Sequence, residues 1–338
     1  MRIVITGATG NVGSALLRRL AEEPDVELAG IVRRPPLAGA GAPFDDVQWH
    51  AADLGNPACV PRVTEWLAGA DAVIHLAWRI QPSHDRTAMR RTNVDGTRHL
   101  LDAVAAAGVP TLLYASSVGA YSPGPKTRFV DESWPVAGVA GSAYSEDKAV
   151  VEALLDDAER ADPDRRIVRL RQALVFQRRA GAEIVRYFLG GLVPSGLLRP
   201  GRLPVVPTDP RLRAQAVHAD DLADAYALAL RSDARGAFNI AADPVLDPRV
   251  LADLLRARTV PVPALLLRVA AAATWLARLQ PTDPGWVDMA VSTPLMDATR
   301  AHLELGWKPR YSATEALAEI VTGMAARADA PTPALRAH

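Results

Sequence analysis

The chain has 338 residues, of which 49% are hydrophobic and 22% are charged, a composition that excludes general disorder. Lysine plus arginine and aspartate plus glutamate are balanced at 38 each, so no net positive field draws the chain to nucleic acid or to an anionic membrane. The single cysteine, Cys59, cannot form an internal disulfide, and the apolar run 1–5 is too short for a signal peptide. We therefore expect a folded cytoplasmic protein with neither a nucleic-acid nor a membrane partner.

The first half of the chain alternates short β-branched runs with longer amphipathic runs. This spacing predicts strands at 2–6, 26–32, 72–76, 111–115 and 166–170, and helices at 12–23, 91–107 and 144–160. Strands that alternate with helices indicate an α/β fold with a doubly wound parallel sheet of the Rossmann type.

The second half predicts a smaller, discontinuous C-terminal lobe. Residues 178–213 are rich in glycine, proline and arginine, which is typical of elements added outside a main sheet. We expect a Rossmann domain at 1–175 that is re-entered at about 215–241, and a substrate-binding lobe at 176–214 and 242–325. Residues 326–338 are expected to form a flexible tail.

One apolar stretch, residues 265–279, resembles a membrane segment in composition. Arg268 and Arg278 interrupt it, and Pro261 and Pro263 stand just before it. We expect either a buried helix or a helix that packs on the lobe.

The strongest local motif is the glycine-rich segment 6–13, which lies between a predicted strand and a predicted helix. Glycines at 7, 10 and 13 permit a tight turn, a close approach of backbone to a pyrophosphate, and close packing of the helix. The candidate dinucleotide-binding residues in this turn are Gly7, Thr9, Gly10, Asn11, Val12 and Gly13.

The residues that end the second strand decide which dinucleotide binds. An acidic residue there would bind a free ribose 2′-hydroxyl, whereas this chain has Arg33 and Arg34, which can bind a 2′-phosphate. NADP(H) is therefore favoured over NAD(H), with two solvated arginines as the alternative interpretation. Asp53 and Leu54 are candidates to flank the adenine.

A tyrosine and a lysine four residues apart, Tyr144 and Lys148, lie on one face of a predicted helix. Such a pair can do acid–base work if the lysine and the cofactor lower the tyrosine pKa, a change that needs roughly 4 kcal/mol. Ser116 and Ser117 follow a predicted strand and can place a hydroxyl against a substrate oxygen.

At this point the chain resembles the extended short-chain dehydrogenase/reductase family, often labelled NAD-dependent epimerase/dehydratase. The resemblance extends from Met1 to about Val321 and includes the further segments 75–78, 93–97, 217–221, 238–241 and 305–309. It implies that Tyr144 is the general acid/base, with Lys148 as its partner, and that Ser117 rather than Ser116 orients the substrate. It also implies that Leu76 and Ala77 border the cofactor. Relatives are often dimers, which leaves a homodimer open.

Two departures from the family pattern matter. Val118 and Gly119 stand where dehydratases carry an Asp-Glu pair, so dehydratase chemistry is not expected. Arg171-Gln172-Ala173 lacks a proline that many relatives carry. No cluster of histidines has ligand spacing, and His218 near Asp220 is interpreted as part of a helix start rather than a metal site.

These observations predict an NADP(H)-dependent oxidoreductase that transfers hydride to or from a carbonyl or alcohol carbon of a small molecule. A nucleotide-sugar epimerase with tightly bound NAD is the first alternative, although residues 192–198 and 203–206 are apolar for a diphosphate-sugar site. A non-catalytic dinucleotide sensor is the second. The conspicuous tryptophans Trp275, Trp286 and Trp307 are expected to be packing residues.

Overall fold

The computed structural model describes residues 1–81, 83–189, 194–280 and 282–336. Residues 192–193 of the apolar lobe segment and residues 337–338 of the predicted tail lie outside these ranges.

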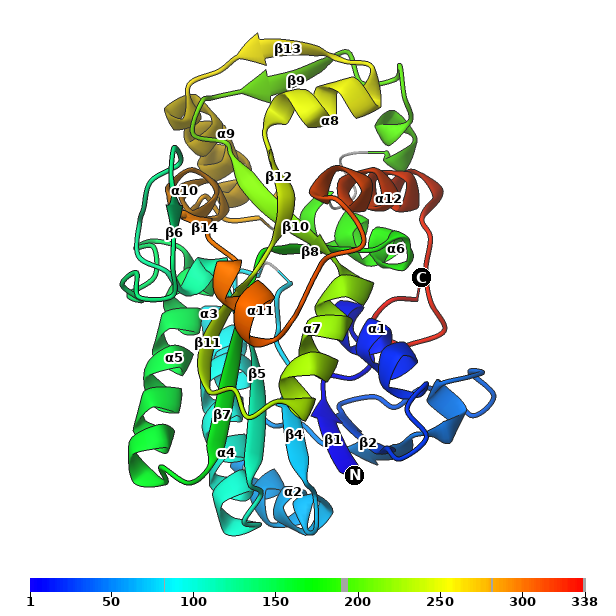
Figure 1. Cartoon of the computed structure of the whole chain (residues 1–338). Coiled ribbons are helices and arrows are strands. Elements are labelled where there is room, and N and C mark those ends of the chain that lie inside the picture. The colour runs from blue at the N-terminus through cyan, green and yellow to red at the C-terminus, as the bar shows by residue number, and fades with distance from the viewer. Residues whose placement is uncertain (82, 190–193, 281, 337–338) are drawn as a thin grey trace.

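Within the described residues, seven parallel strands form the main sheet in the order β11-β7-β5-β4-β1-β2-β3 (Figure 1). The strands are β1 (Arg2–Thr6), β2 (Glu27–Val32), β3 (Gln48–Ala51), β4 (Ala72–His75), β5 (Thr111–Ser117), β7 (Arg166–Gln172) and β11 (Gly236–Ile240). This is the predicted doubly wound sheet. The sequence analysis did not identify the edge strand β3, whose four residues QWHA show no clear alternation of apolar and polar side chains.

Helices cover both faces of this sheet. One face carries α1 (Asn11–Leu20), α7 (Ala219–Arg231) and α11 (Thr299–Glu304), and the other carries α2 (Val60–Leu67), α4 (Gly96–Ala106) and α5 (Ala143–Ala161). The short α3 (Arg86–Arg90) and a π-helical turn at Arg91–Asp95 lead into α4. Short 3-10 turns lie at Phe44–Asp46, Pro57–Cys59, Val118–Ala120, Arg178–Ala180 and Ser195–Leu198.

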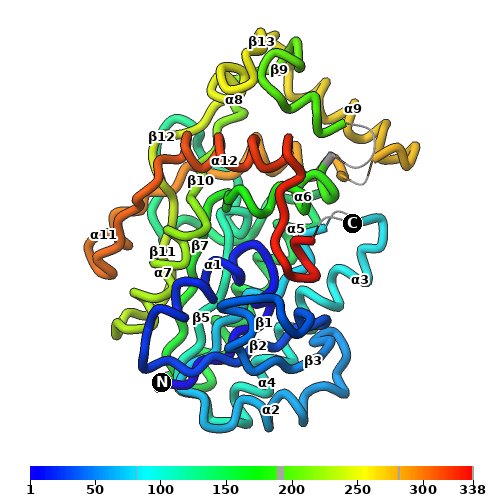
Figure 2. The backbone as a smooth tube through the Cα atoms, turned by 90° about the vertical axis from the view of Figure 1, so that its right-hand side faces the viewer, coloured from blue at the N-terminus to red at the C-terminus, as the bar shows by residue number. Residues whose placement is uncertain are grey.

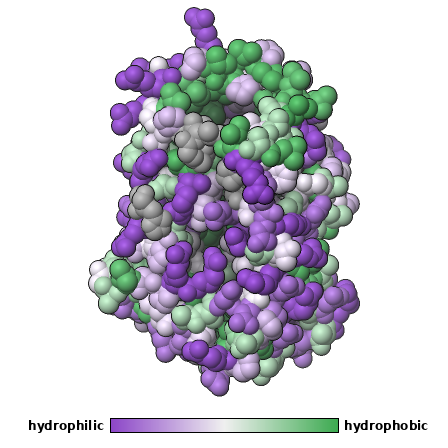
Figure 3. Space-filling view, turned by 180° about the vertical axis from the view of Figure 1, so that it is seen from behind, coloured by the Kyte–Doolittle hydropathy of each residue, from purple (hydrophilic) through white to green (hydrophobic). Residues whose placement is uncertain are grey.

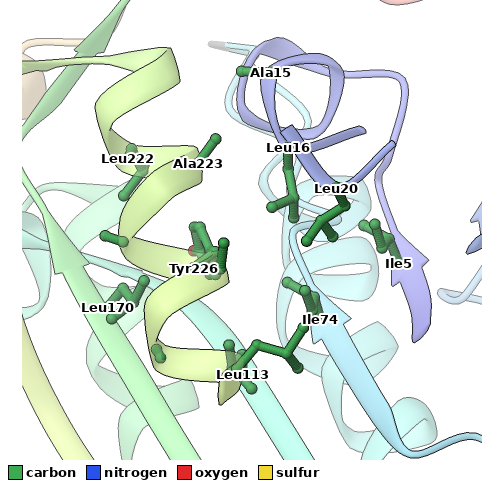
Figure 4. Close-up of a cluster of buried hydrophobic side chains, with 14 of the residues drawn as sticks. Ile5, Ala15, Leu16, Leu20, Ile74, Leu113, Leu170, Leu222, Ala223 and Tyr226 are labelled. Carbon is green, nitrogen blue, oxygen red and sulfur yellow. The ribbon is translucent and has the colours of Figure 1, made fainter. Parts of the chain in front are cut away.

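The alternation of side chains along each strand explains why both faces need cover. On β1, Ile3 and Ile5 pack against the layer that contains α1 and α7, whereas Val4 packs into the opposite layer. All three side chains are fully buried. Figure 4 shows the first of these layers, in which Leu16 of α1 and Tyr226 of α7 meet above the sheet. Strands buried on both faces read as continuous apolar runs, which is why the sequence identified them.

The strand order reverses between β1 and β4, and this switch point sets the position of the site. In open parallel sheets the ligand crevice lies at the carboxyl ends of the strands on either side of such a reversal. His75 at the end of β4 connects the strands of the switch point to α4. Its Nδ1 lies 2.6 Å from Thr6 Oγ1 of β1, and its Nε2 lies 2.9 Å from Thr97 Oγ1 of α4. Burial lowers the pKa of His75 to about 3, so the ring is neutral.

The smaller lobe lies beyond the carboxyl edge of the main sheet (Figures 1 and 2). Its strands are β8 (Leu174–Phe176), β10 (Ala214–His218) and β12 (Ala242–Leu246) in one sheet, with the pairs β9 (Val205–Thr208) with β13 (Arg258–Pro261) and β6 (Phe129–Val130) with β14 (Leu295–Met296). Its helices are α6 (Gly181–Ile184) with a π-helical turn at Val185–Leu189, α8 (Pro248–Leu255), α9 (Ala264–Leu276), α10 (Gly285–Ser292) and α12 (Ala313–Ala326).

The boundary between the two parts differs from the expected one. Strand β10 does not re-enter the main sheet but pairs with β8 and β12, so the re-entry is made by α7 and β11. Trp307 also belongs to the main core: its side chain is fully buried, and its Nε1 donates to Asp221 O at 2.8 Å. Contacts between segments far apart in sequence determine where β10 and Trp307 lie, and the periodicity of apolar residues does not predict such contacts.

Two further expectations are corrected. Helix α9 is not a buried helix, because Ala264 is its one buried residue, although it does pack against α10 within the lobe. The segment after α12 is not a free tail: Leu335 is fully buried, Ala328 O accepts from Ala182 N, and Thr332 Oγ1 donates to Thr9 O at 2.8 Å. The described part of the tail therefore packs against the glycine turn.

Candidate functional site

The glycine turn lies at the switch point, where β1 ends. Gly7 has φ +71°, and a Cβ there would lie 2.6 Å from Ala77 N, so a side chain is excluded by both strain and contact. A Cβ on Gly13 would lie 2.5 Å from Gly7 O. These two glycines are required by the packing of the turn against α1 and against Leu76 and Ala77, which follow β4.

Gly10 differs from its two neighbours in the motif. A Cβ there would meet only Gly7 O, at an ordinary contact distance of 3.4 Å, and the backbone is not left-handed. Protein packing therefore does not require glycine at this position. The missing side chain leaves space directly over the turn, which fits the close approach of a phosphate group.

The start of α1 is open to an anion. Gly10 occupies the cap position, and no side chain there accepts from the first backbone N–H groups of the helix. Those groups and the helix dipole favour a negative group. The Asn11 side chain is used elsewhere, since its Nδ2 donates to Val175 O at 3.0 Å and its Oδ1 accepts from Gln177 at 2.8 Å. Thr9 is buried and Val12 packs on the core, so these residues can offer a ligand their backbone.

The candidate specificity residues gather at the ends of β2 and β3. Val32 pairs with Ala51, which brings the segment after each strand to the same corner of the sheet. Arg33 and Arg34 are exposed there, and neither side chain makes a hydrogen bond or ion pair within the described residues. Asp53 is also exposed and accepts from Gly55 N, whereas Leu54 is buried in the core.

Tyr144 lies in the first turn of α5, and Lys148 lies one turn further on. The helix starts at Ser142, whose side chain accepts from Ser145 N. Both residues are almost completely buried. Lys148 Nζ donates to Ala115 O at 2.6 Å and to Tyr114 Oη at 3.1 Å, so it is bound to β5 behind the tyrosine ring.

Burial dominates the electrostatics of this pair. Burial raises the pKa of the Tyr144 phenol to about 12, and the nearby Ser117 hydroxyl lowers this pKa only in part. Burial lowers the pKa of Lys148 to about 7, against the raising effect of Glu152 and Asp147. Within the protein alone, Lys148 does not bring the pKa of Tyr144 near neutrality, and its lowering by the lysine and the cofactor together stays a prediction. Bringing this pKa near neutrality would take roughly 7 kcal/mol, and a neutral phenol is suited to donate a proton.

The two serines at the end of β5 have separate environments. Ser116 is fully buried and its hydroxyl donates to Glu152 Oε1 at 2.5 Å. Glu152 in turn accepts from Arg171 Nε at 3.0 Å and from Arg169 at 3.1 Å. Ser116 thus belongs to a buried ionic network, and Ser117 is the serine that contacts Tyr144. Arg171, which marked a departure from the family pattern, is the bidentate partner of Glu152 in that network.

An aromatic wall surrounds Tyr144, and the sequence analysis gave its members no role in the site. The Tyr144 ring centroid lies 5.9 Å from that of Trp78 and 5.3 Å from that of Trp286, and Phe188 lies 4.9 Å from Trp286. Lys148 Nζ lies 3.6 Å above the Trp78 ring. Trp78 follows β4, so the sequence could have placed it at the carboxyl edge of the sheet, where a ligand binds. Trp286 and Phe188 come from the small lobe, and no local pattern identifies them.

A glycine turn at the switch point of a parallel sheet, together with a buried Tyr-x-x-x-Lys pair beside it, defines a dinucleotide-dependent enzyme of the extended short-chain dehydrogenase/reductase type. Residues 3–241 match the NAD dependent epimerase/dehydratase family, and the chain belongs to that family. No helix among the described residues is long and apolar enough to cross a membrane.

Individual relatives are more distant. The chain is 29% identical over 181 residues to the decarboxylating sterol-4-alpha-carboxylate 3-dehydrogenase of Saccharomyces cerevisiae. The aligned region covers 52% of this chain and 51% of that protein. The chain thus spans about half the length of this relative. Among solved structures it is similar to UDP-glucose 4-epimerase of Thermotoga maritima with UDP-glucose, with TM-score 0.72, 19% identity and coverage of 97% and 99% of the two chains. The UDP-glucose 4-epimerase of Thermus thermophilus with NAD gives TM-score 0.69, 22% identity and coverage of 96% and 99%. These two likenesses establish the fold.

Proposed function

We propose that the protein is an oxidoreductase that interconverts an alcohol and a carbonyl group on a small, largely apolar molecule. The observation that carries the proposal is the buried Tyr144 phenol, which contacts Ser117 and faces an aromatic wall beside the glycine turn. A raised pKa keeps this phenol protonated at neutral pH, so it can give its proton to an oxygen that becomes an alkoxide.

The roles of the residues follow from their positions. A dinucleotide bound over the glycine turn supplies or accepts the hydride at the substrate carbon. Ser117 donates a hydrogen bond to the substrate oxygen, and Tyr144 delivers the proton, so that a carbonyl plus hydride plus proton becomes an alcohol. Lys148, when protonated, places a positive charge behind the phenol, and its ammonium group would be the donor available to a cofactor hydroxyl if it left Ala115 O.

The choice of cofactor is the finer part of the proposal. We infer that Arg33 and Arg34 bind the 2′-phosphate of NADP(H), because both are exposed at the end of β2 and no carboxylate is paired with either among the described residues. The family description and the solved relatives with NAD make NAD(H) the competing cofactor. Calorimetric titration with NADPH and with NADH separates the two, after a check for dinucleotide carried through purification.

The aromatic wall favours an apolar substrate over a nucleotide sugar. Trp78, Trp286 and Phe188 offer ring faces and no charged group, whereas a diphosphate needs cationic or backbone donors. The 29% identity to a sterol dehydrogenase over half of the chain supports this direction. The nucleotide-sugar epimerase remains the alternative, and tightly retained NAD with no net consumption would favour it.

The test is Tyr144→Phe, measured with NADPH and a panel of apolar ketones. We expect turnover to fall at least about a hundredfold while dinucleotide binding is kept. The control is Tyr226→Phe, because the Tyr226 hydroxyl is buried in the core without a hydrogen-bond partner among the described residues. Comparable turnover in Tyr144→Phe and the parent protein would refute the role of Tyr144.

A further inference from the structure

Helix α9 presents an uncovered apolar face to solvent. Leu265 is 66% exposed and Leu276, at the other end of the helix, is 73% exposed. At roughly 100° per residue the exposed apolar side chains of the helix fall within a sector of about 140° that holds no charged residue, and the exposed Arg268 lies outside this sector. We name these residues the α9 apolar face: Leu265, Leu266, Val269, Ala270, Ala273, Leu276 and Ala277.

The α9 apolar face continues onto neighbouring segments at the same end of the molecule. Val260 of β13 is 42% exposed and Leu279, just past the helix, is 57% exposed. Figure 3 shows hydrophobic atoms gathered at the end of the small lobe where Figure 1 places β9, β13 and α9. Soluble monomers rarely leave a contiguous patch of this kind uncovered, so the patch calls for a partner.

The segment that contains this face is locally cationic, although the Asp209 carboxylate, which is paired with Arg211, accepts from Ala264 N at the start of α9. From residue 254 to residue 282 the sequence contains four arginines and no aspartate or glutamate. Arg256, Arg258 and Arg278 are exposed, and their side chains make no hydrogen bond or ion pair within the described residues. Arg268 is the exception, because it pairs with Asp288 at 2.7 Å. The sequence analysis expected no membrane contact because the whole chain has balanced charge, but whole-chain charge does not report this local excess of arginine.

We propose that the α9 apolar face binds the surface of a bilayer that contains anionic lipids. An apolar helix face bordered by arginines is the combination that such a surface recognises: the leucines enter the acyl boundary and the guanidinium groups contact headgroup phosphates. The helix of 13 residues is about 20 Å long, shorter than the hydrocarbon core of about 30 Å. It therefore lies in the plane of the membrane and does not span it.

A second copy of the chain fits this face less well. A symmetric dimer through α9 would bring the unpaired arginines of both copies together, and like charges at an interface oppose association. An anionic surface instead neutralises them. The same argument disfavours a basic protein partner.

The α9 apolar face also lies on elements that connect it to the candidate site. The Trp275 ring of α9 stacks on His84 at 4.4 Å, and α9 packs on α10, which carries Trp286 against Tyr144. A molecule dissolved in the bilayer would thus meet the aromatic wall close to the membrane surface. This extension rests on the proposed function, whereas the membrane binding itself does not.

The experiment is flotation of the full chain with vesicles of phosphatidylcholine alone and with phosphatidylglycerol added. We expect binding to the anionic vesicles that weakens with salt, and little binding to the neutral ones. Leu265→Gln with Leu276→Gln should reduce binding at least about tenfold, and each of Arg256→Gln and Arg278→Gln by about fivefold.

The matched control is Leu37→Gln with Leu303→Gln, since these leucines are 69% and 79% exposed but lie away from α9, one after β2 and one in α11, which packs on β11. This pair should leave vesicle binding unchanged. Equal loss in both double variants would overturn the proposal, as would absence of flotation with anionic vesicles. A dimer that the Leu265/Leu276 variant converts to monomer, without vesicle binding, would assign the face to a second copy. All three readouts are independent of turnover, so they separate this proposal from the proposed activity.

Discussion

The three glycines of the turn should separate stability from ligand binding. Gly13→Ala places a Cβ 2.5 Å from Gly7 O and 2.6 Å from the backbone of Ala8, and neither backbone atom can move cheaply. Overpacking of this kind costs about 1–3 kcal/mol or more. Gly10→Ala places its Cβ 3.4 Å from Gly7 O, at a φ of −80° that alanine accepts, so its cost is the loss of a favourable helix cap, about 1 kcal/mol or less.

Dinucleotide binding should rank the same two variants differently. The Cβ of Gly10→Ala fills the space over the turn, so we expect the Kd for the dinucleotide to rise at least about tenfold, equivalent to about 1.4 kcal/mol, in a protein of nearly parental stability. Urea denaturation measures the stability of each variant, and calorimetric titration measures its Kd for the dinucleotide. Gly108→Ala is the control for stability alone, because Gly108 has φ +66° but no atom within 4 Å of its Cβ.

Unchanged dinucleotide affinity in Gly10→Ala would refute the placement of a phosphate over this turn. A loss of stability in Gly10→Ala as large as that in Gly13→Ala would instead contradict the contact argument, since the two sites would then be equally crowded.

Three further predictions use the site. Lys148 has its pKa lowered to about 7 by burial, so between about pH 7 and pH 10.5 the unfolded chain holds a proton that the folded chain has released, and the stability of the parent protein rises with pH in that window. Lys148→Met lacks this rise. The free energy of unfolding of the variant minus that of the parent, measured by urea denaturation, should therefore fall by up to about 5 kcal/mol from below pH 7 to above pH 10. Arg33→Ser and Arg34→Ser should each weaken NADPH binding about tenfold or more and leave NADH binding unchanged, as measured by calorimetry; equal effects on both dinucleotides would contradict 2′-phosphate recognition. Ser117→Ala should lower kcat about tenfold or more with little change in urea midpoint, whereas Ser116→Ala should cost about 1–3 kcal/mol of stability, because it removes a bond to a buried carboxylate, and spare kcat; the reverse pattern would exchange the roles of the two serines.

The sequence alone determined the class of fold and the local parts of the site. Parallel strands covered on both faces are long apolar runs, and the glycine spacing is imposed by contacts within a few residues or with the adjacent strand. A periodicity of four likewise placed Tyr144 and Lys148 on one helix face. These signals are local, so they survive in the linear chain.

Tertiary structure decided the environment of those residues. Burial among Trp78, Trp286 and Phe188 raises the pKa of Tyr144, and two of these rings come from another lobe. The pairing of Ser116 with Glu152 gives the two neighbouring serines separate environments, and only the packing of α5 on β5 produces this difference.

The exposure of α9 and the packing of the tail were likewise decided only in three dimensions. The sequence of an apolar helix does not show whether another element covers it. Whole-chain net charge likewise does not show that part of the small lobe is cationic. Thr332 contacts Thr9 across 323 residues, a pairing that has no local signal. Side-chain pattern determines which elements form, whereas burial, pKa and exposed surface depend on which elements finally pack together.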